Sequence, residues 1–197
     1  MSVRARTRHR SRALGTLTGI ALTALLVTLV VTQLQHAQPE PGLPLQDAAT
    51  IRAQAREKRL DPALIAAVIY AETKFEPSTS SAGALGLMQI LPETANFIAS
   101  KSGGISFTTS DLATPAVNLA YGSWYLRYLL DHYGGRELPA IAAYNAGLAN
   151  VDEWLAHSGG ELTVAGIPFP ETQAYVQRVM QAQREYRATY PRQLGLG

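Results

Sequence analysis

The stretch that decides the fold is residues 61–73, DPALIAAVIYAET. Asp61 followed by Pro62 is a strong signal for the start of a helix, because the aspartate can cap the first turn and proline suits the first helical position. The helix that follows is apolar on almost every side, and a helix of that kind lies in the middle of a core. We therefore expect the rest of the domain to be built around residues 62–73.

Capping residues, prolines and glycines mark the ends of further helices on both sides of this segment. We expect these helices to run from Asp47 to about Leu60, from Thr114-Pro115 to Gly134-Gly135, from Pro139 to Gly147, and from Glu171 or Thr172 to the residue before Pro191. Alternating β-branched runs are nearly absent, and residues 161–169, ELTVAGIPF, are the single candidate for a short strand pair. The expected fold class is all-α.

The N-terminal part of the chain differs from the rest. Residues 1–12 carry five arginines and no acid, and the 22 residues 13–34 carry no charge at all. As a helix, 22 residues span ~33 Å, close to the ~30 Å hydrocarbon core of a bilayer. The positive-inside rule then predicts a basic cytoplasmic tail over 1–12 and a transmembrane anchor over 13–34. A Pro-rich linker over 35–46 would lead to a folded domain over 47–197.

A cleaved signal peptide is the alternative interpretation of residues 13–34. Two observations favour an uncleaved anchor: the apolar run exceeds the ~7–15 residues of a usual signal-peptide core, and no small-x-small cleavage site follows it. Either interpretation places the folded domain outside the cytoplasm. The anchor would make the protein a single-pass protein of the cytoplasmic (inner) membrane, with the membrane as a partner.

Composition excludes several classes of function. The chain has 197 residues and a net charge of +2, but residues 13–197 hold 12 basic against 15 acidic side chains, so no nucleic-acid-binding face is expected. The absence of cysteine excludes disulfides, zinc fingers, iron–sulfur clusters and a cysteine nucleophile. The four histidines are scattered without an i,i+4 pair, so we expect no metal and no cofactor.

Glu72 is the chemically unusual residue of the core helix. Its helical neighbours at i−4 and i−3 are Val68 and Ile69, so its carboxylate is poorly solvated and its pKa should rise. A carboxylic acid that keeps its proton near neutral pH can donate it to a leaving oxygen. The alternative is that Glu72 turns outward at the end of the helix, beside Lys74 and Glu76.

Several short motifs follow Glu72 along the chain. They are SSAGALGLMQ at 80–89, NLAYG at 118–122, AAYNAG at 142–147 and ETQAYV at 171–176. Together and in this order they closely resemble the soluble-lytic-transglycosylase-type catalytic domain, a lysozyme-like fold related to goose-type lysozyme. The resemblance runs from about Leu60 to Val179, which is most of the folded part.

The resemblance implies a role for each matched position. Glu72 matches the catalytic glutamate, and the other matches are expected to line the sugar-binding cleft or support the site: Ser80 near the N-acetyl group, Met88 and Gln89 on sugar, Tyr144 approaching the glutamate with Asn145 as its neighbour, and Glu171 and Tyr175 as a pair beside the site. The family usually has serine after the glutamate, and this chain has Thr73. The hydroxyl is retained, so the departure concerns the orientation of Glu72 more than its proton chemistry.

The expected substrate is the glycan strand of peptidoglycan. Most glycosidases use two carboxylates, but Glu76, Asp111, Asp131 and Glu171 all lie in more solvated contexts than Glu72. A single carboxylate needs a nucleophile from the substrate, and the tethered C6 hydroxyl of N-acetylmuramic acid supplies one. We therefore expect a lytic transglycosylase that cleaves the β-1,4 bond to N-acetylglucosamine and leaves a 1,6-anhydro ring. A hydrolytic muramidase and a non-catalytic wall-binding or scaffold module are the alternatives.

Overall fold

The structure is a computed structural model that describes residues 42–103 and 108–197. The predicted basic tail, the transmembrane anchor and most of the linker fall in residues 1–41, outside the described part. No helix within the described ranges is long and apolar enough to cross a membrane.

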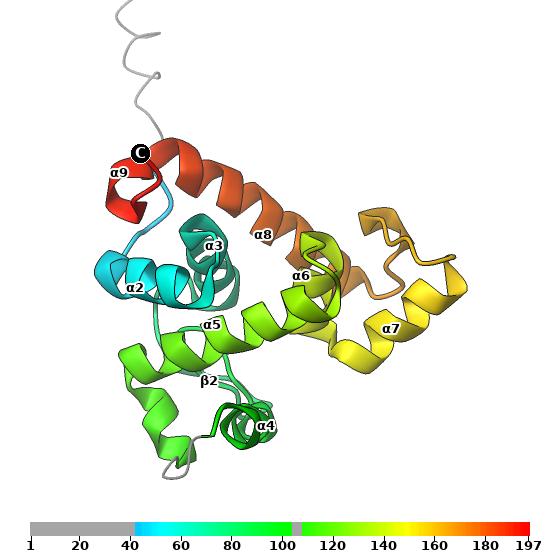
Figure 1. The fold of residues 1–197 in the computed structure, drawn as a ribbon, viewed down its shortest axis with the longest axis horizontal. Coiled ribbons are helices and arrows are strands. Elements are labelled where there is room, and N and C mark those ends of the chain that lie inside the picture. Colours follow the sequence, from blue (N-terminus) through cyan, green and yellow to red (C-terminus); the bar gives the residue numbers. More distant parts are fainter. Residues whose placement is uncertain (1–41, 104–107) are drawn as a thin grey trace, which may run out of the picture. The chain divides into compact units, whose positions relative to one another are not determined.

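Helices make up most of the described chain (Figure 1). They are α2 (Ala48–Lys58), α3 (Pro62–Thr73), α4 (Pro92–Ser102), α5 (Pro115–His132), α6 (Glu137–Ala146), α7 (Leu148–His157), α8 (Pro170–Thr189) and α9 (Pro191–Leu194), with 3-10 turns η1 (Thr109–Ala113) and η2 (Val164–Gly166). Two short antiparallel strands, β1 (Ser78–Thr79) and β2 (Leu85–Gly86), form a hairpin. The all-α expectation is confirmed for the body of the domain, and this small sheet is an addition to it.

α3 is the central helix, as residues 61–73 predict. The side chain of Asp61 accepts a hydrogen bond from the backbone N–H of Ala63 at 3.0 Å, and Pro62 occupies the first helical position. Every residue from Ala63 to Ile69 is buried. The helix packs chiefly against α8 and also against α2 (Figure 1). This packing places the last turn of α3, which carries Glu72, beside α8.

Some predicted boundaries are wrong for local reasons. Asp47 precedes α2 as expected, but it has a left-handed backbone (φ 53°) and its side chain makes no capping bond. α6 begins at Glu137, two residues before Pro139, because proline is tolerated anywhere in the first turn, where its missing N–H has no partner to lose. Residues 161–169 form no strand pair and contain the η2 turn instead. The helices α4 and α7 were not expected from the sequence.

The last residues of the predicted linker belong to the folded unit. Tyr186 Oη donates to the carbonyl of Pro44 at 2.6 Å, and Tyr190 Oη donates to the carbonyl of Leu43 at 2.8 Å. The unit spans residues 42–197, and all of its buried apolar residues lie between Ile51 and Leu194. Residues 42–197 therefore contain their own hydrophobic core, and we expect this fragment to fold by itself.

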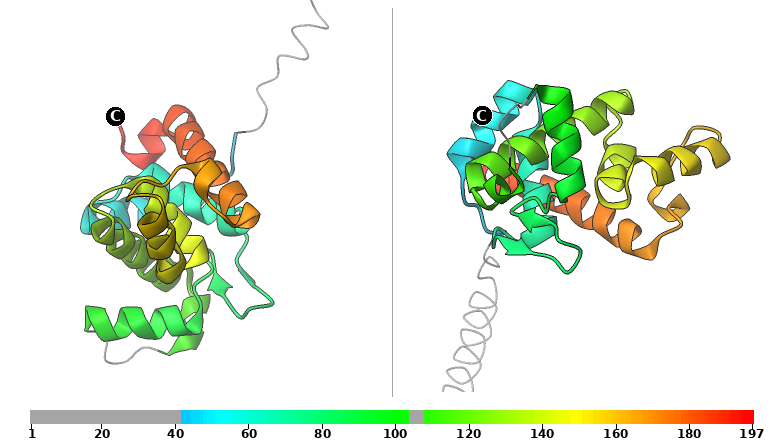
Figure 2. Two further views of the ribbon diagram at one scale, coloured as in Figure 1. Left: turned by 90° about the vertical axis from the view of Figure 1, so that its right-hand side faces the viewer. Right: turned by 90° about the horizontal axis from the view of Figure 1, so that it is seen from below.

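The hairpin projects from the helical body in both views of Figure 2. Ser78 pairs with Gly86, and Thr79 pairs with Leu85. Gly86 has a positive φ of 75°, and a Cβ on it would lie 2.2 Å from Nδ2 of Asn118. Only glycine fits here, so the hairpin can approach α5 closely at the edge of the site.

Candidate active site

Glu72 is paired with a tyrosine from the last long helix. Tyr175 of α8 donates its hydroxyl hydrogen to Oε1 of Glu72 at 2.7 Å. Tyr175 is only 4% exposed, and Glu72 is partly buried. Because α3 packs along α8, this hydrogen bond holds the carboxyl at the junction of the two helices.

Burial raises the pKa of Glu72 from its ordinary 4.5 to about 7. The hydrogen bond from Tyr175 and the positive charge of Arg178 oppose this rise because both favour the ionised form, but desolvation has the larger effect. The expected desolvation of Glu72 is confirmed, and the alternative that it turns outward into water is wrong. A carboxyl with this pKa can both give up and take a proton near neutral pH.

Tyr144 lies in the same electrostatic neighbourhood. Burial raises its pKa well above the ordinary value for a tyrosine, and the negative charge of Glu72 is the next largest cause. Its hydroxyl donates to the carbonyl of Met88 at 3.0 Å, and its ring lies 5.6 Å from that of Tyr125. Tyr144 thus connects α6 to the segment that follows the hairpin.

Asn145, the next residue, is exposed, and its side chain is fixed from behind. Oγ1 of Thr172 donates to Oδ1 of Asn145 at 2.7 Å, and Thr172 is only 2% exposed. This bond directs the amide oxygen of Asn145 toward α8. The amide NH₂ is left as the group that a ligand would meet.

A buried asparagine fastens the segment between the hairpin and α4. Oδ1 of Asn118 accepts from the backbone N–H of Met88 at 2.8 Å, and its Nδ2 donates to the carbonyls of Leu85 at 2.8 Å and Leu112 at 3.1 Å. Asn118 is fully buried, and its bonds to Met88 and Leu112 are shielded from water. They hold the segment against α5.

Thr73 holds the same segment from the side of α3. Its hydroxyl donates to the carbonyl of Leu87 at 2.8 Å. The family departure from serine to threonine therefore keeps a working hydrogen bond next to Glu72.

The side chain of Met88 does not have the position expected for a sugar contact. It is fully buried, and a Cβ on Gly122 would lie 2.4 Å from its Sδ. The expectation that this side chain touches sugar is wrong, because the Met88 side chain fills space against the glycine of α5. Only its main chain takes part in the site, by accepting from Tyr144.

Two other expected sugar contacts lie in or beside the hairpin. Oγ of Ser80 accepts from the backbone N–H of Ala84 at 3.0 Å, which closes the hairpin turn. Nε2 of Gln89 donates to the carbonyls of Ser78 at 2.9 Å and Gly86 at 2.8 Å. Both side chains are partly exposed while they stabilise the hairpin.

Glu171 and Tyr175, both expected behind or beside the site, differ in exposure and in their partners. Tyr175 is bonded to Glu72, whereas Glu171 is exposed in the first turn of α8. The structure brings together Glu72, Tyr144 and Tyr175, and leaves Glu171 at the rim.

Sequence reasoning missed Thr172 and Arg178, although helical spacing places both within three residues of Tyr175. Within residues 42–103 and 108–197, no group of three or more His, Asp or Glu side chains could hold a metal ion.

Comparison with known proteins gives the family. Residues 49–164 match the model of the transglycosylase SLT domain. The soluble lytic murein transglycosylase of Salmonella typhimurium is 34% identical over 138 residues, covering 67% of this chain and 21% of that protein. The corresponding protein of Escherichia coli K12 is 33% identical over 136 residues, covering 66% and 21%. The chain spans about a fifth of the length of these relatives.

Solved structures agree. The lytic transglycosylase Slt of Pseudomonas aeruginosa, in an inactive mutant form, gives a TM-score of 0.68 at 32% identity over 74% of this chain and 24% of that one. The 70-kDa soluble lytic transglycosylase of E. coli gives 0.70 at 30% identity over 74% and 25%, and it has also been solved in complex with bulgecin A. The match of a family model to more than half of the chain, with helical structures of the same fold, shows that this chain belongs to the transglycosylase SLT domain family.

Proposed function

We propose that the domain is a peptidoglycan lytic transglycosylase that cleaves the β-1,4 bond between N-acetylmuramic acid and N-acetylglucosamine. The observation that carries the proposal is the carboxyl of Glu72, partly buried against Tyr175 with a pKa of about 7. The names of the relatives, soluble lytic murein transglycosylases, support the choice of substrate.

In the first step, protonated Glu72 donates its proton to the glycosidic oxygen as the bond to C1 of N-acetylmuramic acid breaks. The released N-acetylglucosamine end takes that proton as its new hydroxyl. C1 becomes electron-deficient, and the 2-acetamido group of the same sugar stabilises it. Glu72 is left as a carboxylate, a form that the Tyr175 hydroxyl and the Arg178 charge both favour.

In the second step, the C6 hydroxyl of the same muramic acid attacks C1, and the carboxylate of Glu72 takes the hydroxyl proton. The product carries a 1,6-anhydro ring, no water is consumed, and Glu72 returns to its protonated form. The attacking hydroxyl is tethered to the reacting sugar, so it has an effective concentration that water lacks. One carboxyl serves as acid and then as base, and its pKa near 7 suits both roles.

The surroundings of Glu72 favour this one-carboxylate route. Glu76 and Glu171 are exposed, and Asp111 accepts hydrogen bonds from Thr108 in a capping box of the η1 turn. None of these carboxylates shares the desolvated setting of Glu72, so we assign none of them as the nucleophile or general base that a two-carboxylate glycosidase needs.

The exposed polar groups around Glu72 are the proposed substrate contacts. Asn145 offers its amide NH₂, and Ser80 and Gln89 offer partly exposed side chains beside the hairpin. Tyr144 is proposed to limit how closely the sugar approaches Glu72. We assign Glu171 to the rim of the site, with a weaker contribution to binding.

We also propose that residues 13–34 anchor the protein in the cytoplasmic membrane with the domain outside the cytoplasm. The support is the charge pattern of the sequence: five arginines before an uncharged stretch of 22 residues. N-terminal sequencing of the membrane-bound protein tests this. Recovery of a mature chain that starts after residue 34 would replace the anchor with a cleaved signal peptide.

The test of the activity is digestion of purified murein by residues 42–197, followed by mass spectrometry of the products. The expected product is a muropeptide ending in 1,6-anhydro-N-acetylmuramic acid, one water lighter than the product of hydrolysis. A product that has gained water would assign a hydrolytic muramidase instead. Zymography with Glu72→Gln is the control, and equal clearing by the variant and the wild type would defeat the catalytic assignment of Glu72. No clearing by the wild type would assign a non-catalytic module.

A further inference from the structure

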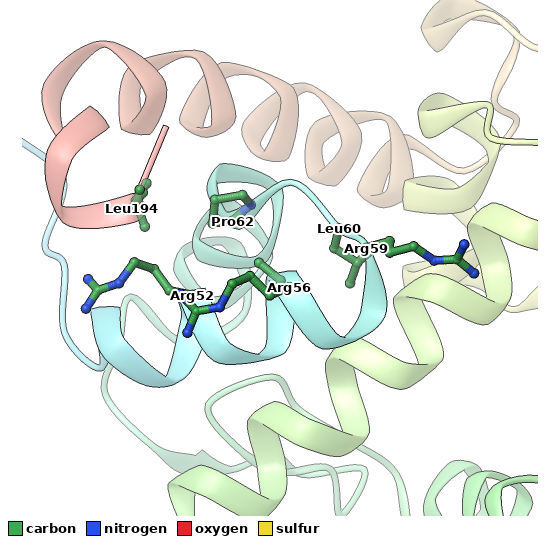
Figure 3. Close-up of a pocket in the computed structure, with 8 residues that line it drawn as sticks. Arg52, Arg56, Arg59, Leu60, Pro62 and Leu194 are labelled. Carbon is green, nitrogen blue, oxygen red and sulfur yellow. The ribbon is translucent and has the colours of Figure 1, made fainter. Parts of the chain in front are cut away.

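A pocket lies at the opposite end of α3 from Glu72. It has a volume of about 260 Å³ between α2, the start of α3 and α9. Its lining combines basic and apolar side chains, including Arg52, Arg56, Arg59, Leu60, Pro62 and Leu194 (Figure 3). Pro62 and Glu72 are ten residues apart on one helix, or about 15 Å at 1.5 Å per residue. The pocket is therefore separate from the proposed catalytic site.

The pocket is positively charged in a domain that is not. Residues 42–197 contain 12 Lys and Arg against 14 Asp and Glu, yet four of the 12 cations fall within residues 52–59. The one acid in that stretch, Glu57, is paired with Lys58 at 2.7 Å. Asp61 is bonded to Arg187 of α8 at 2.8 Å. Within the described part of the chain, no salt bridge neutralises the three arginines of the pocket.

Two of these arginines are arranged to share one anion. Arg52 and Arg56 are one helical turn apart and point the same way along α2, whereas Arg59 points the opposite way (Figure 3). Arg52 is fixed in place by donating to the carbonyl of Gln193 in α9. Like charges at this spacing repel each other, and an anion between them removes that repulsion. Guanidinium groups bind phosphate through paired hydrogen bonds, so phosphate chemistry suits the pair.

The position of the pocket indicates where such a phosphate would come from. Gly42, where the described chain begins, lies against Thr189 and Tyr190 at the junction of α8 and α9. α9 also forms one wall of the pocket through Leu194. If residues 13–34 are anchored in the membrane, the seven residues 35–41 span at most ~25 Å. A tether of that length limits how far Gly42 could lie from the headgroups of the bilayer.

We propose that the pocket formed by Arg52, Arg56 and Leu194 binds the phosphate of anionic phospholipid headgroups. This inference rests on the proposed membrane anchoring and not on the catalytic assignment. Contact through this pocket would leave Glu72, at the other end of α3, free to meet the glycan strand. Binding by two or three arginines is weak on its own, and the covalent anchor would make it effective by raising the local concentration of headgroups.

The test is co-sedimentation of residues 42–197 with vesicles at millimolar lipid and low salt. We expect binding to vesicles of about 70% phosphatidylcholine and about 30% phosphatidylglycerol, because an anionic surface of roughly this composition attracts clusters of basic residues. Binding should be lost in 0.5 M NaCl, where the Debye length falls to about 4 Å. Each arginine contributes about fivefold at such a surface, so Arg52→Gln with Arg56→Gln should weaken partitioning about 30-fold.

The matched control removes two exposed positive charges elsewhere, by Arg184→Gln with Lys101→Gln. It should weaken partitioning by much less, because neither side chain lines the pocket. Arg56→Gln with Arg59→Gln is a second pocket variant that leaves the Arg52 contact to α9 intact. Circular dichroism melts confirm that every variant is folded. Equal binding to pure phosphatidylcholine vesicles, or equal losses in the pocket and control variants, would overturn the proposal.

Two further arms test the chemistry and the source of the anion. Inorganic phosphate at matched ionic strength should compete with the vesicles, and vesicle binding that it leaves unchanged would overturn recognition of phosphate by the pocket. Sedimentation with intact murein, using Glu72→Gln to prevent digestion, tests for wall carboxylates. If the pocket variant loses murein binding and keeps vesicle binding, the lipid assignment is wrong. Cleavage of soluble glycan by Arg52→Gln with Arg56→Gln should be unchanged, so failure here is distinguishable from failure of the catalytic proposal.

Discussion

Replacing Glu72 with glutamine should stabilise the domain at high pH and have little effect at low pH. Folding raises the pKa of this carboxyl from 4.5 to about 7, so the folded state holds the proton more tightly than the unfolded chain does. Stability from this group is complete below about pH 4.5 and is lost as the pH rises through about 7. Glutamine does not ionise, so the stability of the variant should not fall with pH through this position.

The size of the effect follows from the pKa difference. Each pKa unit corresponds to about 1.4 kcal/mol, so the change from 4.5 to about 7 gives roughly 3–4 kcal/mol as an upper figure. Glu72 is partly exposed, and screening by solvent reduces the expected free energy to about 2 kcal/mol. For a domain of this size, that corresponds to about 4–8 °C in Tm. The amide oxygen of glutamine can still accept from Tyr175, so the hydrogen bond is kept.

Thermal melts by circular dichroism measure this directly. The Tm of wild type, Glu72→Gln and Glu76→Gln is compared across roughly pH 4.5–9, the range that brackets both pKa values. The difference between Glu72→Gln and wild type should grow as the pH rises from about 4.5 and level off above about 8. Glu76 is exposed and serves as the matched control, with no such growth expected. A constant difference for Glu72→Gln over this range would refute the desolvation argument.

Three further substitutions test the contacts around Glu72. Tyr175→Phe removes the hydrogen bond that favours the carboxylate, so the basic limb of the pH–rate profile should move up by about one unit, and an unmoved limb would contradict the role of this bond. Asn118→Ala leaves backbone groups of the site without their hydrogen-bond partners, so it should lower the free energy of unfolding in urea by about 3 kcal/mol or more. A decrease of less than about 1 kcal/mol would show that water replaces the side chain. Thr172→Val removes the hydrogen bond that orients the amide of Asn145, so it should raise KM more than it lowers kcat. Thr172→Ser keeps a hydroxyl and should restore KM. An unchanged KM in Thr172→Val would show that Thr172 does not position the substrate.

The core helix was predictable because its signals are local. The helix starts where Asp61 caps its first turn and Pro62 takes the first helical position, and the apolar run that follows indicates burial. These signals involve residues close together in the sequence, so sequence alone is sufficient to predict them. The raised pKa of Glu72 was predictable for the same reason, since residues at i−3 and i−4 desolvate it. The hydrogen-bond partner of Glu72 was not predictable from local sequence, because Tyr175 lies 103 residues further along the chain.

Other predictions failed where tertiary packing decides. Asp47 occupies a cap position, but its backbone is left-handed and its side chain caps nothing. Met88 belongs to a motif whose resemblance implies sugar contact, yet it packs into the space left by Gly122. No local pattern tells a side chain at the floor of a cleft from one beneath it. The family resemblance identified the segment but could not give the direction of each side chain.

The position of Glu72 at the end of α3 explains how one carboxyl can serve two steps. Deeper in the helix, where Val68 and Ile69 are fully buried, a carboxyl would have no access to a substrate and no partner for its charge. One turn further, at Glu76, the carboxyl would be exposed to water, with nothing to desolvate it. At Glu72, desolvation raises the pKa while Tyr175 and Arg178 lower it, and the balance is about 7. A carboxyl at this balance gives up a proton at little cost and takes one back at little cost, which a reaction without a second carboxylate requires.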